Sequence, residues 1–291
     1  MIMKKLILTG STGFIGSALL KELKKESIEI ICLGKRRGEI DNTANCVYFD
    51  KYEEIPEIIS KLSPDIIIHC AALYSLNDTP ALNCELIDSN IKLSTLLASS
   101  AKQNCIDEFL YIGTIWQDYI EERGFESQSI YTVSKKLAWN SINWICGNEK
   151  TKVIGVKLSD TFGINDQRKK ILDLLVDSAI KKEMLEMTPG YQEVRLTSVT
   201  AICKAISDVV MNRVYVPAGD YTMPGKVLTI RDLSKILEEK LEVKELYKFG
   251  TLDYREGTRL KLPDTEKLLP LLSEIDFERD LCQYIESKLG L

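Results

Sequence analysis

Short apolar segments alternate with longer amphipathic segments along the chain up to residue 158. The apolar segments are rich in Ile, Leu and Val and predict β-strands, whereas the amphipathic segments predict α-helices. Because the strands are apolar at nearly every position, helices should cover both faces of the sheet. The fold class is therefore predicted to be α/β, with a doubly wound parallel sheet. The predicted strands are residues 5–9, 28–33, 46–49, 65–70, 108–113 and 152–158.

The composition is that of a globular protein with a substantial core. Of the 291 residues, 45% are hydrophobic. The 38 basic and 43 acidic residues give a net charge of −5, which argues against a general affinity for nucleic acid or an anionic membrane. No stretch approaches the roughly 18 to 20 apolar residues that a membrane span requires.

The cysteines indicate a reducing compartment. Eight cysteines lie far apart, mostly within apolar segments, and no C-x-x-C pair occurs. We interpret them as reduced core residues and predict a cytoplasmic protein. The N-terminal sequence "MIMKKLILTGSTGFIGSALL" imitates a signal peptide, but residues 9–13 interrupt its apolar run. We expect a strand, a loop and a helix there instead.

A glycine-rich loop follows the first predicted strand. The sequence "TGSTGFIGSALLKEL" has G-x-x-G-x-x-G spacing and leads directly into a predicted helix. Glycines let the backbone turn tightly and approach a pyrophosphate, which binds at the positive N-terminus of the helix. At the first strand of an α/β chain this pattern favours a dinucleotide-binding Rossmann fold over an ordinary turn. The predicted cofactor contacts are Gly10, Thr12, Gly13, Phe14, Ile15 and Gly16.

A basic turn, "GKRR", ends the second predicted strand at residues 34–37. The adenosine ribose of a dinucleotide would lie at this position. An NAD site commonly has Asp or Glu here, whereas an NADP site needs cations for the 2′-phosphate. We therefore predict NADP(H) rather than NAD(H), with Lys35 and Arg36 as ligands of the phosphate. The alternative is a solvated basic turn without a ligand.

Tyr131 and Lys135 lie four residues apart in a predicted helix, "YTVSKKLAWNSINWI", and so share one of its faces. A phenol transfers protons poorly at neutral pH unless a cation stabilises its phenolate, which Lys135 could do. Thr114 lies at the carboxyl end of the predicted strand 108–113, the sheet edge at which ligands of such folds bind. The alternative is a half-buried tyrosine beside a surface lysine.

The chain resembles the extended short-chain dehydrogenase/reductases, the family of NAD(P)-dependent sugar-nucleotide epimerases, dehydratases and reductases. The motifs that carry the resemblance span most of the chain. They are the glycine loop, "HCAA" (69–72), "DSNIKLSTLL" (88–97), "GT" (113–114), "YTVSK" (131–135) and "YREG" (254–257). The match is stronger up to residue 163 than beyond it.

The resemblance implies roles for individual residues. Tyr131 would be the catalytic acid/base, Lys135 would lower the pKa of its phenol and hold the nicotinamide ribose, and Thr114 would bond the reacting oxygen. Ala71 and Ala72 would line the cofactor groove, Asp50 would approach the adenine, and Asn90 would brace the nearby strands. The predicted substrate contacts are Tyr74, Trp116 and Gln117 for the sugar and Arg255 for the diphosphate.

Several positions depart from the family pattern. Lys157 stands in "GVKLSDTFG" where an arginine is usual, and the later arginine motif reads "VRLTSVT", so Arg195 is not assigned to the substrate. His69, the only histidine, is interpreted as a satisfied core residue rather than a catalyst. No cluster of residues supports a metal site.

The residues after Thr114 and the basic turn narrow the range of possible reactions. Dehydratases of the family carry an acid pair after the catalytic Ser/Thr, whereas Ile115 and Trp116 follow Thr114 here. With an NADP-type turn, we predict NADPH-dependent reduction of a 4-keto, 6-deoxy nucleoside-diphosphate sugar. The alternatives are an NAD-retaining 4-epimerase and a non-catalytic NADP-sensing regulator. The "GTIWQ" segment loosely resembles synthases of cytidine- or thymidine-linked deoxysugars.

The domain organisation follows from the same pattern. We predict an NADP-binding domain at residues 1–163, to which a strand near 213–219 returns, and a mainly substrate-binding cap at residues 164–291. A homodimer through helices at 90–103 and 131–146 is expected from the resemblance and from the apolar residues of "LAWNSINWI".

Overall fold

The chain folds into two compact units, each with its own hydrophobic core. Unit 1 comprises residues 1–158, 203–223 and 265–272, and unit 2 comprises residues 159–202, 224–264 and 273–291. The computed structural model describes residues 3–35, 45–75, 77, 79–118, 129–147, 150–166, 168–255, 258–263 and 267–290.

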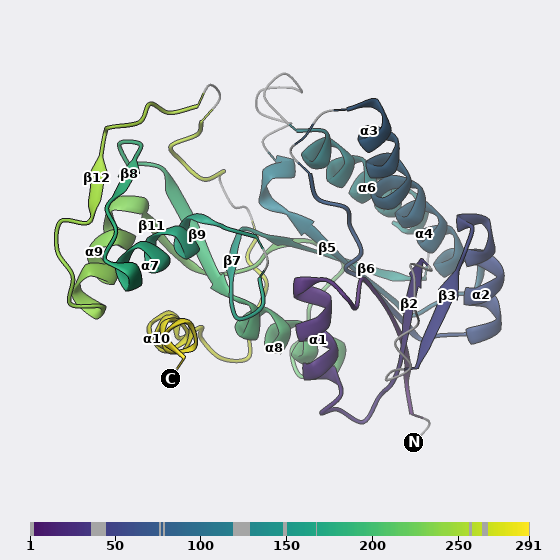
Figure 1. Cartoon of the computed structure of the whole chain (residues 1–291). Helices are drawn as coiled ribbons and strands as arrows, with labels where there is room; N and C mark the ends of the chain where they lie inside the picture. Colours follow the sequence, from purple (N-terminus) through teal and green to yellow (C-terminus); the bar gives the residue numbers. More distant parts are fainter. Residues whose placement is uncertain are drawn as a thin grey trace. The chain divides into compact units, whose positions relative to one another are not determined.

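Unit 1 is built on a seven-stranded sheet with the order β10-β6-β5-β4-β1-β2-β3, in which all registered neighbours are parallel (Figure 1). The first strand lies in the interior of the sheet and the chain winds outward from it in both directions. The predicted doubly wound α/β fold is therefore confirmed. The strands are β1 (Lys5–Thr9), β2 (Glu29–Lys35), β3 (Cys46–Phe49), β4 (Ile66–His69), β5 (Glu108–Thr114), β6 (Lys152–Leu158) and β10 (Gly219–Thr222).

Helices cover both faces of this sheet because residues that alternate along each strand are apolar on both sides. Ile7, Ile67 and Phe109 share one core with α2, α4 and α6, while α1 and α8 lie on the opposite face (Figure 1). The helices are α1 (Phe14–Leu23), α2 (Ile55–Leu62), α3 (Pro80–Leu86), α4 (Leu93–Gln103), α6 (Ile130–Cys146) and α8 (Val199–Val210), the last shared by both units.

The last strand of the sheet lies later than the apolar run at 213–219 suggested. The backbone N–H groups of Arg213 and Val214 both donate to Asp208 O, at 2.8 and 3.4 Å, so this run begins as the turn that follows α8. Tyr215 is 82% exposed, and Pro217 has no N–H to give to a ladder. Pairing with β6 starts only at Gly219, opposite Ile154.

The described residues of unit 2 form two small sheets and three helices that lie wholly within it. One sheet has the order β11-β9-β7, and the other is a parallel pair of β12 and β8. Leu175, Leu196, Leu233 and Leu281 are buried in its core. The elements are β7 (Asp160–Phe162), α7 (Ile171–Lys181), β8 (Leu185–Met187), β9 (Glu193–Ser198), β11 (Lys226–Thr229), α9 (Ile230–Lys240), β12 (Tyr247–Phe249) and α10 (Phe277–Leu289).

Candidate active site

Thr114 is the last residue of β5, at the carboxyl edge of the large sheet. A 3-10 turn, Ile115–Asp118, follows at once and folds back onto it. The Thr114 N–H donates to Gln117 Oε1 at 3.3 Å, and the Trp116 N–H donates to Thr114 Oγ1 at 3.4 Å. Because the hydroxyl oxygen accepts from the backbone, its hydrogen remains available to an oxygen of a bound molecule.

Tyr131 and Lys135 lie on α6, which begins where the Ser129 side chain accepts a hydrogen bond from the Thr132 N–H. Lys135 Nζ donates to Ile112 O in β5 at 2.6 Å and lies 4.2 Å from the centroid of the Tyr111 ring. Lys135 is thus fixed to the strand that ends in Thr114, and Tyr131 lies one helical turn before it.

The environment of Lys135 is nearly dry. The side chain is buried, and this burial lowers the pKa of its ammonium to about 7. A carbonyl oxygen and an aromatic face are weak compensation for lost water. Lys135 therefore titrates close to neutral pH, as a group that takes part in proton transfer commonly does.

Asn90 lies within a π-helical turn, Ile87–Lys92, between α3 and α4. Its Oδ1 accepts from the Leu73 N–H at 2.7 Å, and its Nδ2 donates to Leu73 O at 3.0 Å and to Ser134 Oγ at 2.8 Å. The extra residue of a π turn re-aims side chains, and such turns are frequent at functional sites. Asn90 joins the loop after β4 to the first turns of α6.

The glycine loop has the geometry that close approach to a phosphate requires. Gly10 has φ +72°, and a Cβ there would lie 2.6 Å from Ala71 N. A Cβ at Gly16 would lie 2.1 Å from Gly10 O, so α1 packs directly on the loop. Gly13 is the N-cap of α1 without a side-chain hydrogen bond, and no acidic residue occupies the first helical turn. These features fit the pyrophosphate of a dinucleotide.

The other predicted cofactor residues lie along the same edge of the sheet. Ala71 and Ala72 directly follow β4, and Ala72 is exposed. Lys35 ends β2 with its Nζ 4.8 Å from the Tyr52 ring centroid, and Asp50 directly follows β3. Arg36 lies outside the described residues.

The predicted substrate contacts differ in their exposure. Tyr74 is 49% exposed, and its ring meets that of Tyr131 edge-on at 4.9 Å between centroids. Trp116 is 37% exposed. Arg255 is an exposed residue of unit 2.

Gln117 does not fit its predicted role as a sugar contact. Its side chain is fully buried and holds the Thr114 backbone. Gly113 makes room for it, since a Cβ there would lie 2.9 Å from Gln117 Oε1. Gln117 is therefore placed to shape the turn after Thr114 rather than to touch a substrate.

Sequence reasoning missed the ion pairs behind this turn. Lys157 Nζ lies 2.8 Å from Asp118 Oδ2 and 3.2 Å from Asp220 Oδ2. The cation thereby ties the 3-10 turn to β6 and β10. The replacement of the usual arginine by Lys157 marked this position, but the partners are far away in the sequence.

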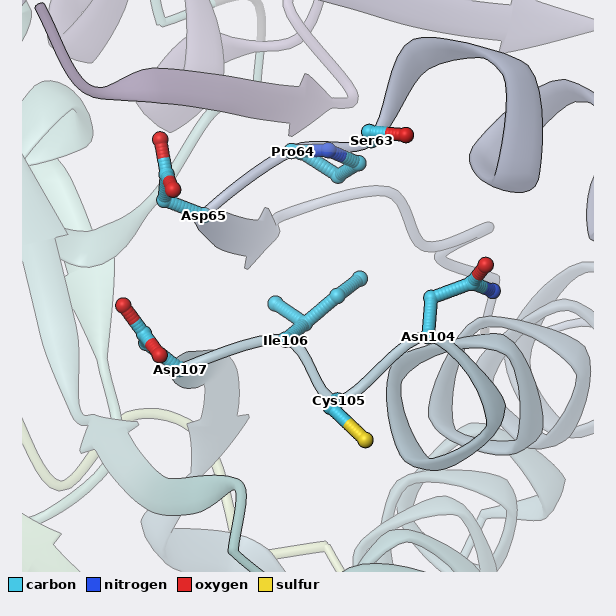
Figure 2. Close-up of a pocket in the computed structure, with 7 residues that line it drawn as sticks. All are labelled: Ser63, Pro64, Asp65, Asn104, Cys105, Ile106 and Asp107. Carbon is cyan, nitrogen blue, oxygen red and sulfur yellow. The ribbon is translucent and has the colours of Figure 1, made fainter. Parts of the chain in front are cut away.

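A surface pocket lies at the other edge of the sheet (Figure 2). Its walls are the segments that lead into the amino ends of β4 and β5, residues 63–65 and 104–107. It is therefore separate from the carboxyl edge where Thr114 lies. Within the described ranges, no group of three or more His, Cys, Asp or Glu side chains could hold a metal ion, and no helix is long and apolar enough to cross a membrane.

Comparison with known proteins identifies the family. The model of the NAD dependent epimerase/dehydratase family matches residues 6–220, so the chain belongs to that family. A CDP-abequose synthase from Yersinia pseudotuberculosis is 29% identical over 210 residues, covering 71% of this chain and 73% of that protein. A CDP-abequose synthase from Salmonella typhimurium is 23% identical, covering 86% of each chain.

Solved structures share the fold at low sequence identity. One is a UDP-N-acetylglucosamine 4-epimerase from Methanobrevibacter ruminantium M1 in complex with UDP-N-acetylmuramic acid, with a TM-score of 0.77, 20% identity and coverage of 100% of this chain and 99% of that one. Another is DesIV, a dTDP-glucose 4,6-dehydratase from Streptomyces venezuelae with NAD and TYD bound, with a TM-score of 0.76, 18% identity and coverage of 98% and 97%.

Proposed function

We propose that this protein reduces the 4-keto group of a nucleoside-diphosphate sugar, a 6-deoxy sugar in particular, with NADPH. The observation that carries the proposal is the arrangement of Thr114, Tyr131 and Lys135 at the carboxyl edge of the sheet, beside a glycine loop that fits a dinucleotide. NADPH, when bound, supplies the hydride. The phenol of Tyr131 gives its proton to the oxygen that gains negative charge, and the Thr114 hydroxyl donates a hydrogen bond to the same oxygen.

Lys135 supports both tasks. Its ammonium stabilises the phenolate that Tyr131 leaves behind, and it donates to a ribose hydroxyl of the cofactor. Its contacts in the structure are the Ile112 carbonyl and the Tyr111 ring. When the cofactor is bound, a phenolate and a ribose hydroxyl replace these partners. They compensate the buried ammonium better for the water that it has lost.

The preference for NADPH rests on the basic turn. Lys35 is the last residue of β2, where the 2′-phosphate of the adenosine ribose would lie, and Arg36 follows it in sequence. The family is NAD-dependent by its description, and neighbours such as DesIV hold NAD. Charge-assisted hydrogen bonds from two cations favour the phosphorylated cofactor in this chain.

The relatives suggest the nucleotide of the substrate. Two curated relatives that cover most of the chain are named CDP-abequose synthases, so a cytidine-diphosphate sugar is the first substrate to test. Arg255 is proposed to bind the diphosphate, and Tyr74 and Trp116 to contact the sugar. A guanidinium suits a diphosphate through its fork of donors.

Two other reactions are less well supported. Dehydration needs an additional acid near Thr114, but Ile115 and Trp116 follow it, and Asp118 is paired with Lys157. A 4-epimerase remains the second candidate, because it uses the same Thr114, Tyr131 and Lys135 with a cofactor that stays bound.

A homodimer is proposed through α6, on which Leu137 and Trp144 are 42% and 86% exposed.

The test combines two measurements on the purified protein. Mass spectrometry of the denatured protein identifies any cofactor retained, and absorbance follows the oxidation of added NADPH with a panel of nucleotide-linked 4-keto sugars. We expect net oxidation of NADPH with at least one of them. Retained NAD with interconversion of 4-hydroxy epimers would establish the epimerase, and binding of NADPH without turnover on any sugar would indicate a sensor.

A further inference from the structure

His69, the only histidine of the chain, lies in the middle of a buried chain of hydrogen bonds. Its Nδ1 is 2.7 Å from Thr9 Oγ1, and its Nε2 is 2.8 Å from Ser94 Oγ. All three side chains are at most 1% exposed. The ring lies at the carboxyl end of β4, directly before the segment that includes Ala71.

The donors and acceptors around the ring fit together in one direction. The Ser94 hydroxyl donates to Asn90 O at 2.5 Å, so toward the ring its oxygen can only accept, and His69 Nε2 must carry a hydrogen. His69 Nδ1 then accepts from the Thr9 hydroxyl, whose oxygen accepts from the Ala71 N–H at 3.2 Å. In the other tautomer, with the hydrogen on Nδ1, the hydrogen of the Thr9 hydroxyl would have no acceptor in this series of bonds.

The chain of bonds joins the two halves of the candidate site. At one end, Thr9 immediately precedes Gly10 of the glycine loop and bonds Ala71, against which Gly10 packs. At the other end, Ser94 bonds the carbonyl of Asn90, and the Asn90 amide donates to Ser134 Oγ.

The last link reaches the catalytic helix. The Ser134 hydroxyl donates to Tyr131 O at 2.7 Å. The relative position of the cofactor loop and the Tyr131 helix therefore depends on a continuous series of buried neutral groups.

We propose that His69 is a positioning residue. As a permanently neutral ring with its hydrogen on Nε2, it aligns the glycine loop with the helix that carries Tyr131. The functional part of this inference rests on the proposed function, since it takes the loop to bind the cofactor and Tyr131 to transfer a proton. Neither ring nitrogen is free to contact a substrate, so His69 acts through its neighbours.

The surroundings keep the ring neutral. Burial, and then the positive charge of Lys135, lower the pKa of His69 to about 3. The rings of Phe109 and Tyr111 lie 6.3 and 5.7 Å from the imidazole between centroids, and its polar contacts are the two hydroxyl groups. An imidazolium would have two hydrogens to donate, and the Thr9 oxygen would have to reverse its own bond to receive one.

The first part of the test is a spectrum of the unaltered protein labelled with ¹⁵N-histidine. A single histidine gives a single pair of ring nitrogens, so no assignment by mutation is needed. We expect a protonated Nε2 and an unprotonated Nδ1, with no titration between about pH 5.5 and 8.5, the range in which an ordinary histidine changes charge. A hydrogen on Nδ1, or a titration near the ordinary pKa, overturns the proposal.

The second part uses two substitutions that each keep half of the ring's contacts. The amide oxygen of His69→Asn can replace Nδ1 as acceptor for Thr9, and the amide nitrogen of His69→Gln can replace Nε2 as donor to Ser94. We expect His69→Gln to weaken NADPH binding about three- to tenfold, the usual effect of one lost hydrogen bond, with a smaller loss of turnover. His69→Asn should lower the turnover number more than it weakens NADPH binding.

The outcomes separate positioning from bulk stability and from the proposed reaction. A residue that only stabilises the fold gives parallel losses in the two variants, with no split between NADPH affinity and turnover, and this result contradicts the proposal. If no sugar is turned over at all, the proposed function fails. The ring spectrum and the NADPH titrations still decide whether His69 aligns the loop. If a variant does not fold, the spectrum of the unaltered protein still tests the proposal, because a hydrogen on Nδ1 or a titration near the ordinary pKa overturns it.

Discussion

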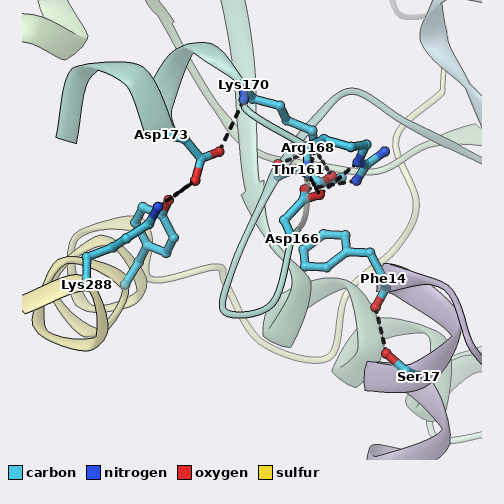
Figure 3. A network of polar contacts seen from close by, with 9 residues as sticks. Phe14, Ser17, Thr161, Asp166, Arg168, Lys170, Asp173 and Lys288 are labelled. Carbon is cyan, nitrogen blue, oxygen red and sulfur yellow. Dashed lines mark hydrogen bonds and ion pairs between the residues drawn. The ribbon is translucent and has the colours of Figure 1, made fainter. Parts of the chain in front are cut away.

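A polar network in unit 1 and another in unit 2 are built from different kinds of group. In unit 1, the network around His69 consists of neutral groups, from Thr9 through Ser94 to Asn90. In unit 2, the network around Asp173 contains charges (Figure 3). Asp173 accepts a hydrogen bond from the Tyr284 hydroxyl and pairs with Lys288 at 3.0 Å.

The loop after β7 in unit 2 shows the same character. Asp166 pairs with Arg168 at 2.8 Å and with Lys170 at 3.0 Å (Figure 3). Buried ion pairs hold elements together but lose much of their value when one partner is removed or neutralised. Neutral chains of hydrogen bonds do not change with pH and fix geometry instead. We infer that the His69 network fixes geometry, and that the contacts of Asp173 and Asp166 contribute to stability through their charges.

The largest expected effect is on catalysis, in unit 1. Tyr131→Phe should lower the turnover number by roughly two to four orders of magnitude, because the proton must arrive as the oxygen becomes negative. NADPH affinity should barely change, since the substitution removes one hydroxyl and leaves the basic turn and the glycine loop unaltered. Steady-state NADPH oxidation and a cofactor titration test this. Near-normal turnover would remove Tyr131 from the mechanism and favour the sensor.

The next effect is on stability, in unit 2. Asp173→Ala should lower the free energy of unfolding by about 2 to 4 kcal/mol, because it leaves the buried Tyr284 hydroxyl and the Lys288 ammonium without their shared partner. Asp177→Ala is the matched control: it also pairs with Lys288, at 3.2 Å, but its side chain is 37% exposed, against 11% for Asp173.

Chemical denaturation measures both variants. The control should lose no more than about 0.5 kcal/mol. Equal losses in the two variants would show that burial of the charge in unit 2 has no special importance.

A smaller effect concerns the choice of cofactor. The double substitution Lys35→Ser and Arg36→Ser should weaken NADPH by roughly ten- to a hundredfold and leave NADH nearly unchanged, because only the 2′-phosphate gains charge-assisted hydrogen bonds. Lys61→Ser is the control, since this lysine pairs with Glu57 on the surface of α2. Fluorescence titration with both cofactors decides the matter. An equal loss for NADPH and NADH refutes the assignment of the basic turn.

A further effect is a pH dependence of stability that arises from Lys135, a buried charged group of unit 1. Its pKa is about 7 in the folded protein, against 10.5 ordinarily, so between these values the unfolded chain binds more protons. The contribution of Lys135 to stability therefore rises with pH through this interval, by up to about 1.4 kcal/mol per pH unit. Lys135→Met should lack this rise.

Denaturation of both proteins from about pH 7 to 9.5 isolates the contribution of Lys135. The unfolding free energy of the variant relative to wild type should be highest near pH 7 and fall as pH increases. A difference that stays constant with pH would mean that Lys135 titrates normally.

The sequence predicts unit 1 well because its signals are local. The runs at 5–9, 46–49 and 152–158 coincide with β1, β3 and β6, since a short, mostly apolar run suffices to define a buried strand. The run at 213–219 misled because part of it closes α8 through bonds to Asp208, which no periodicity reveals.

The site was predictable only where its residues lie close together in sequence. Tyr131 and Lys135 share a helix face, and the glycines share one loop, so their spacing carries information. The partners of His69 are 60 and 25 residues away from it, and those of Lys157 are 39 and 63 residues away, so no spacing indicates them. Gln117 was misjudged because a polar residue beside a catalytic threonine can equally well fold inward, where Gly113 leaves space.

The most direct test of the central claim follows the hydride itself. The protein is incubated with NADPH that carries deuterium at the transferable position and with a CDP-linked 4-keto sugar, and the product is analysed by mass spectrometry. We predict one deuterium at C4 of the sugar for each NADPH oxidised, with loss of this transfer in Tyr131→Phe. Conversion of the keto sugar without net oxidation of NADPH, or oxidation of NADPH without deuterium in the sugar, would contradict the reductase. Interconversion of 4-hydroxy epimers without added NADPH would establish the epimerase instead.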